Sequence, residues 1–275
     1  KQENVSSIPI YESYAPEYED LTEAVNVGTI KSWSVIADWY ADLVKKNIKY
    51  DRITQNTFKE IFPNGSNGLS ETEKAEKIYR YICDNITYSF LDFRQSGYVP
   101  QKPSKTITTK LGDCKDLSTL FVTLAEEAGL QANLVLVLTN DNGFKALSLP
   151  SKDFNHCIVR VLIDGKETFL EMTDRYLPFK ALPMSLYHAN ALVINFDKTK
   201  NQAAQLIHIP FDHAIVNKTE TKTVITISEN QKEFSNQHTL FGAGKAYYNE
   251  LFSSATSEDI RKKEFEEMYN SRLNK

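Results

Sequence analysis

The sequence contains no long apolar run. Its longest strongly apolar stretch, Leu134 to Leu138, is far shorter than the roughly 20 residues that a membrane-spanning helix requires. The first residues, Lys1-Gln2-Glu3-Asn4, are polar and no apolar segment follows them, so we expect no signal peptide in this sequence. We therefore predict a chain that does not span a membrane.

An excess of positive charge is also missing. The 275 residues include 32 lysines and arginines against 36 aspartates and glutamates, which gives a net charge of −4, and they contain no basic block. Because nucleic-acid binding depends on neutralising phosphates, we expect no nucleic-acid partner. Hydrophobic residues make up 41% and charged residues 25%, which is typical of a globular protein long enough to bury a substantial core.

Cysteine is scarce, and its pattern suggests no pairing. The three cysteines, Cys83, Cys114 and Cys157, include no C-x-x-C pair, and an odd number gives no complete disulfide framework. Their spacing matches no zinc site, no histidine and acid cluster has ligand spacing, and Asp141-Asn142-Gly143 is too short for a calcium loop. We therefore predict no metal, no other cofactor and at least one free thiol.

Of the three cysteines, Cys114 has the setting best suited to reactivity. It follows Gly112 and Asp113, and it opens a run of helical periodicity that ends at Gly129. We predict that Cys114 lies in the first turn of a helix, where unpaired backbone N–H groups and the helix dipole favour a thiolate over a thiol. Lys115 adds a nearby positive charge.

The pattern elsewhere predicts helices before this cysteine and strands after it. Apolar spacings of three and four predict a helix over 32–47, and a capping box at Ser70-Glu71-Thr72-Glu73 opens a second helix that ends near residue 85. We predict a loop over 91–110, which contains Gln101 and borders Cys114. The strands are predicted at 132–138, 155–163, 166–173, 191–194 and 221–227, and a charged helix or helix pair at 242–274.

A histidine and an acid come together across one predicted hairpin. Asp164-Gly165 is a strong signal for a two-residue turn. Counting outward from it places His156 opposite Thr173, with Glu171 on the same face as His156, at a diagonal that a long side chain can reach. Asp174 is the alternative acid.

These residues are the types that thiol acyl transfer needs. That chemistry uses a thiolate, an imidazole that holds and delivers the proton, and an acceptor that orients the imidazole. Cys114, His156 and Glu171 or Asp174 supply them in that order. Backbone N–H groups at the helix start, together with Gln101 from the loop, are the candidates for an oxyanion hole. Any one of these residues taken singly is more often structural, so the prediction depends on their combination.

The motifs that carry these residues resemble those of the transglutaminase-like superfamily. They are Leu111-Gly112-Asp113-Cys114-Lys115-Asp116, then Phe154-Asn155-His156, then Phe169-Leu170-Glu171-Met172-Thr173, and the resemblance covers roughly residues 30 to 195. It implies an α+β, papain-like core in which a helix with the cysteine packs on an antiparallel sheet with the histidine and acid. It also implies Cys114 as the nucleophile and His156 as the base. The third residue of the family is usually aspartate in an Asp-Pro-Thr motif, so Glu171 departs from the pattern and Asp174 stays an alternative.

The resemblance further implies how the chain is organised and what it does. We expect an extended lead-in over 1–30, a transglutaminase-like core over 31–200, and an accessory β-rich segment with a C-terminal helix over 201–275. The family implies an upstream β-rich domain, an exported protein in the periplasm or outside the cell, and hydrolysis of peptide or protein amide bonds. The alternative is a binding or scaffold module that keeps this fold without turnover.

Overall fold

The computed structural model describes residues 18–21, 25–89, 97–143, 147–197, 204–211, 217–229 and 231–273. Most of the expected lead-in over 1–30 lies outside these residues. Within it, a single helical turn, α1 (Tyr18–Leu21), replaces the extended chain that we expected there. None of the described helices is both long enough and apolar enough to cross a membrane.

Helices precede the sheet along the chain, as the apolar periodicity predicted. They are α2 (Trp33–Lys45), α3 (Arg52–Ile61) and α4 (Glu71–Asn85). The capping box at α4 is confirmed, because the Ser70 hydroxyl accepts from the Glu73 N–H while the Glu73 carboxylate accepts from the Ser70 N–H. The apolar faces of α2 and α4 are buried in the main core.

The loop predicted over 91–110 is partly wrong. Residues 90–96 lie outside the described chain, but α5 (Pro103–Thr109) is a helix. The sequence pointed to a loop because the segment is polar and contains glycine and prolines, and the three threonines of α5 have a low helix propensity. Pro103 at the first turn suits a helix start, and burial of Ser104 and Thr106 against neighbouring helices supplies the stability that propensity lacks. The helix ends at Lys110, whose φ of 53° is left-handed.

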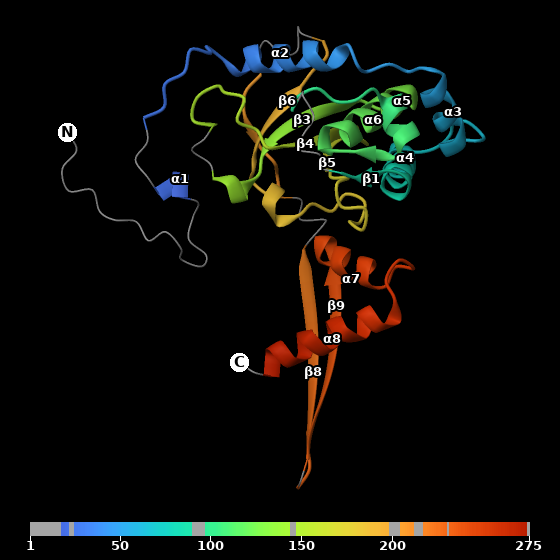
Figure 1. Ribbon diagram of the computed structural model, residues 1–275, viewed down its shortest axis with the longest axis vertical. Helices are drawn as coiled ribbons and strands as arrows, with labels where there is room; N and C mark the ends of the chain where they lie inside the picture. Colours follow the sequence, from blue (N-terminus) through green and yellow to red (C-terminus); the bar gives the residue numbers. More distant parts are fainter. Residues whose placement is uncertain are drawn as a thin grey trace, which may run out of the picture.

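The centre of the molecule is a five-stranded antiparallel sheet in the order β5-β4-β3-β6-β7. Its strands are β3 (Ala132–Leu138), β4 (His156–Ile163), β5 (Lys166–Leu170), β6 (Asn190–Ile194) and β7 (Ile207–His208). The helix α6 (Cys114–Glu127) packs on β3 and β4, and this contact forms the core of the fold (Figure 1). The α+β class with a helix on an antiparallel sheet is thereby confirmed.

A short parallel pair fixes where α6 begins. β1 (Thr87–Tyr88) leaves α4 and pairs with β2 (Leu111–Gly112), which leads directly into Cys114. A Cβ on Gly112 would lie 3.0 Å from the Asp116 side chain and 3.1 Å from that of Thr106, so the close approach of the chain to α6 favours glycine there.

The C-terminal region contains a long hairpin and two helices. β8 (Lys218–Ile227) pairs with β9 (Lys232–Phe241), and α7 (Lys245–Leu251) and α8 (Glu258–Leu273) follow. The hairpin extends away from the central sheet (Figure 1). The strand and helix pair predicted here are present, while β9 went unpredicted because neither of its faces is consistently apolar. The division of the chain near residue 200 stays a proposal.

Candidate active site

The start of α6 is organised around two aspartates. Asp113 is the N-cap and accepts from the Asp116 N–H at 3.3 Å, while Asp116 reaches back to accept from the Asp113 N–H at 3.1 Å. This reciprocal pair satisfies backbone donors that a helix start would otherwise leave without partners. It makes Cys114 the first residue of the helix, as the sequence predicted, with its partly buried side chain against the core.

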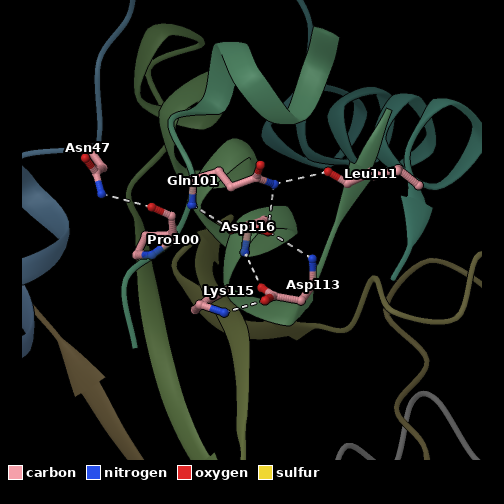
Figure 2. Close-up of polar contacts among 7 residues, drawn as sticks. All are labelled: Asn47, Pro100, Gln101, Leu111, Asp113, Lys115 and Asp116. Atoms are coloured by element: carbon pink, nitrogen blue, oxygen red, sulfur yellow. Dashed lines mark hydrogen bonds and ion pairs between the residues drawn. The ribbon is translucent and has the colours of Figure 1, made fainter. Parts of the chain in front are cut away.

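Asp116 also holds the neighbouring loop. Its fully buried carboxylate accepts from the backbone N–H of Gln101 at 2.7 Å and from the Gln101 side-chain amide at 3.0 Å (Figure 2). The preceding Pro100 carbonyl accepts from Asn47 at 2.9 Å. Lys115, also buried, pairs with the Asp113 carboxylate. The helix start, the loop and the region after α2 are therefore tied together by polar contacts.

These contacts occupy the side chain of Gln101. Its amide nitrogen carries two hydrogens and donates to Asp116 and to the carbonyl of Leu111 at 3.2 Å. A donor to an oxyanion beside Cys114 would have to break one of these bonds. In this conformation Gln101 supports the helix start and donates nothing toward the thiol, in contrast to the role that the sequence suggested.

The hairpin brings His156 and Glu171 together, but β5 ends at Leu170 and not at residue 173 as predicted, so Glu171 follows the strand and the expected pairing of His156 with Thr173 is absent from the register. Ile163 pairs with Lys166 around the turn, so β4 and β5 have the expected alignment. Nε2 of His156 lies 2.5 Å from Oε2 of Glu171. The other carboxylate oxygen, Oε1, accepts from the Thr173 N–H at 2.6 Å, which fixes the orientation of the acid.

Asp174, the alternative acid, is placed elsewhere. Its side chain is exposed and its Oδ1 accepts from the backbone N–H of Tyr176 at 2.9 Å. Its backbone carbonyl accepts from Leu177 in the same turn. Asp174 thus stabilises the turn that follows Glu171, while the structure brings Glu171 to the imidazole.

The pair holds charge in a buried setting. Burial by itself lowers the pKa of His156, but the Glu171 carboxylate and hydrogen bonding to Cys114 and Glu171 outweigh it and raise the pKa to about 10. Burial by itself raises the pKa of Glu171, but the His156 charge and the hydrogen bonds from His156 and Thr173 bring that pKa below its usual range. Near neutral pH the pair is therefore an imidazolium and a carboxylate.

A pocket of about 100 Å³ lies between the cysteine and the histidine. It is open to the outside and is lined by residues from the start of α6, the start of β4, α2 and the loop before α5. These residues include Cys114, His156, Tyr98, Tyr40, Asn155 and Cys157. Cys114 thus lines this pocket together with His156, to which its thiol is hydrogen-bonded.

The other two thiols are more deeply buried than that of Cys114. Cys83 and Cys157 are buried, and burial raises the pKa of Cys83 to about 12 and raises that of Cys157 well above its usual range. Both therefore stay protonated near neutral pH. The Tyr40 hydroxyl hydrogen-bonds to Cys157, and the pKa of Tyr40 is raised by burial and by the nearby Cys157 and Cys114.

Sequence reasoning missed the supporting residues of this site. Asp116 could have been found, because Asp113-x-x-Asp116 has the spacing of a capping box. Tyr98 and Tyr40 gave no local signal, because only the tertiary fold brings them to the pocket. Within the described residues, no group of three or more histidines, cysteines and acids is arranged to hold a metal ion.

Comparisons with known proteins agree with this arrangement. Residues 59–172 match the model of the transglutaminase-like superfamily. A UPF0252 protein of Methanocaldococcus jannaschii is 23% identical over 185 residues, which cover 64% of this chain and 49% of that protein. The chain thus spans about half the length of this curated relative.

Two solved structures are similar to the chain. A putative protease from Parabacteroides distasonis superposes with a TM-score of 0.50 at 11% identity, covering 85% of this chain and 58% of that one. A putative cysteine protease from Cytophaga hutchinsonii covers 71% of this chain and 55% of its own at 13% identity, but its TM-score of 0.35 is too low to define a shared fold. The first likeness concerns the fold alone. Residues 59–172 are therefore similar to the core of the transglutaminase-like superfamily.

Proposed function

We propose that this protein is a thiol-dependent acyl-transfer enzyme that hydrolyses amide bonds in peptides or proteins. Cys114 is the nucleophile, His156 is the acid and base, and Glu171 orients the imidazole. The observation that carries the proposal is the 2.5 Å contact between His156 and the buried Glu171, together with a pocket that both His156 and Cys114 line. The similarity of residues 59–172 to the transglutaminase-like superfamily supports the same reaction class.

The reaction begins with the thiolate. Because Glu171 holds Nε2 of His156, the nitrogen that faces the thiol is Nδ1. An imidazolium beside a thiol favours the thiolate, which attacks the amide carbon and forms a carbon–sulfur bond. His156 then gives its proton to the leaving nitrogen as the carbon–nitrogen bond breaks, which leaves an acyl-enzyme and a neutral imidazole.

The second half of the reaction regenerates the thiol. The neutral His156 takes a proton from water, and the resulting hydroxide adds to the thioester carbon. The carbon–sulfur bond then breaks to give the Cys114 thiolate beside the imidazolium and a carboxylic acid, which loses its proton to solvent as it leaves. An incoming amine in place of water would give transamidation by the same steps. The backbone N–H of Cys114 at the start of α6 is the candidate donor to the oxyanion, since Gln101 is engaged with Asp116 and Leu111.

The alternative is a binding or scaffold module with no turnover. It is favoured by the departure from the family pattern, in which Glu171 stands where aspartate is usual. An inert Cys114 would support it. We further propose that residues 201–275 form an accessory β-rich segment with a C-terminal helix, which follows the core at 31–200. A location outside the cytoplasm stays a prediction.

The proposal is tested by the reactivity of the three cysteines. Iodoacetamide should alkylate Cys114 much faster than Cys83 or Cys157, and mass spectrometry of tryptic peptides resolves the three sites. His156→Ala should slow alkylation of Cys114 alone. Equal rates at the three cysteines, or a rate at Cys114 that is indifferent to His156→Ala, would contradict the enzyme.

A further inference from the structure

Two aromatic rings and one lysine form a cluster at the edge of the pocket. Trp39 of α2 and Tyr98 have ring centroids 5.4 Å apart at an interplanar angle of 73°. The Lys152 ammonium lies 5.3 Å from the Trp39 ring centre and 5.8 Å from that of Tyr98. Both distances are within the range at which a cation is attracted to the face of a ring.

The cluster connects the two sides of the pocket. Tyr98 precedes α5 and lines the pocket beside Cys114, while Lys152 lies four residues before His156. The Tyr98 hydroxyl donates to the Lys152 carbonyl at 3.3 Å, which links these two segments. Among the described residues that line the pocket, Tyr98 is present whereas Trp39 and Lys152 are not. The cation therefore lies at the rim and away from the reacting thiol.

Lys152 is held there by the rings rather than by an opposite charge. Its side chain is exposed, and no carboxylate in the described part of the chain forms an ion pair with its ammonium. An exposed contact of this kind contributes about 0.5–1 kcal/mol, so water and another cation can replace it readily. The rings thus form a cation site whose present occupant belongs to the protein itself.

We infer that Trp39 and Tyr98 form a subsite for a lysine or arginine side chain of the peptide substrate, and that Lys152 occupies this subsite until substrate displaces it. This inference rests on the proposed function and adds the substrate class. Because the subsite lies at the rim, its ligand is a side chain near the scissile amide rather than the reacting amine. Lys152 acts as an internal competitor that lowers the affinity for the substrate cation.

Binding can be measured without catalysis. In a Cys114→Ala background, the indole N–H resonance of Trp39, assigned by its loss in Trp39→Leu, is followed by NMR during titration with N-acetyl-lysine amide. N-acetyl-norleucine amide, which is similar in length but uncharged, is the control ligand. We expect the lysine ligand alone to shift this resonance, and Lys152→Ala to lower its apparent Kd about two- to fivefold. Such a change matches the strength of a cation–aromatic contact.

A second variant shows whether the lysine ligand binds to the aromatic rings or responds only to the change in net charge that Lys152→Ala causes. Tyr98→Leu leaves every charge in place and should abolish the response to the lysine ligand. Equal responses to the two ligands, or no effect of Lys152→Ala, would overturn the inference. An inert Cys114 in the alkylation assay would contradict the proposed function and leave this binding result unaffected, so the two failures are distinguishable.

Discussion

Nε2 of His156 and Oε2 of Glu171 lie 2.5 Å apart although fifteen residues separate them in the chain. The turn between them makes this possible. Asp164 and Gly165 have φ angles of 51° and 75°, both left-handed, as a two-residue hairpin turn with the twist of its strands requires. The turn fixes the register of β4 and β5, and the register decides which acid faces the imidazole.

Replacing Glu171 should lower the pKa of His156. We expect Glu171→Gln to lower the pKa of His156 from about 10, because the carboxylate is the largest of the influences that raise it. The Cε1–H resonance of His156, followed by NMR against pH, measures this shift. The same variant should slow alkylation of Cys114 by about tenfold or more, since the imidazole loses both its charge and its orientation. Unchanged titration of His156 would mean that the ion pair does not form.

Replacing the neighbouring acid should do little. We expect Asp174→Asn to leave the alkylation rate of Cys114 within about twofold, because the side chain is exposed and bonds only within its own turn among the contacts described for it. This variant is the matched control for Glu171→Gln, since both replace a carboxylate with an amide three residues apart. A loss as large as that from Glu171→Gln would assign the third role to Asp174.

Much of the fold could be predicted because its signals are local. The strand at β3 and the hairpin from β4 to β5 show in apolar runs and in one turn dipeptide, and the capping box of α4 is visible in four residues. α5 could not be predicted, because burial against other helices outweighs its threonine-rich sequence. β9 lacks an apolar face and gave no strand signal.

In the candidate site, too, local sequence patterns predicted some residues, while contacts that arise only from tertiary packing could not be predicted. Cys114, His156 and Glu171 were predicted from motif, turn and register, and the structure places Glu171 on His156 and His156 beside Cys114 at one pocket, while their roles stay a proposal. The contacts of Gln101 with Asp116 depend on how α5 packs on α6, which no pattern in the sequence reports. A glutamine that precedes the nucleophile along the chain therefore looked like an oxyanion donor although its amide is engaged elsewhere.

The hydrogen bonds that the Asp116 carboxylate accepts should contribute to the free energy of unfolding. We expect Asp116→Ala to lower the free energy of unfolding by about 3 kcal/mol or more, because it leaves the N–H groups of Gln101 and Asp113 without their acceptor inside the protein. Gln101→Leu removes only donors and should cost about 1–2 kcal/mol. Urea unfolding measures both. A Gln101→Leu variant of full stability that blocks acyl-enzyme formation would instead support a direct role at the oxyanion.

The ion pair should also make stability depend on pH. Because the pKa of His156 is raised from 6.5 to about 10, its contribution is fully present below pH 6.5 and is lost as pH rises through about 10. The pKa of Glu171 is lowered, so its contribution is present above its usual range and is lost as pH falls through the folded-state value. Urea unfolding at pH 6, 8 and 10 should show the difference between wild type and His156→Gln shrinking as pH rises. A constant difference would contradict the raised pKa.

The most direct test of the account is competition among the three thiols for one reagent. At neutral pH, limiting iodoacetamide should label Cys114 at least about tenfold faster than Cys83 or Cys157, because those two thiols are buried and protonated. His156→Ala should remove most of that advantage, while thermal unfolding verifies that the variant is folded. Labelling of Cys114 at the rate of the buried thiols in the wild-type protein would contradict a reactive cysteine and leave a binding module as the better description of this fold.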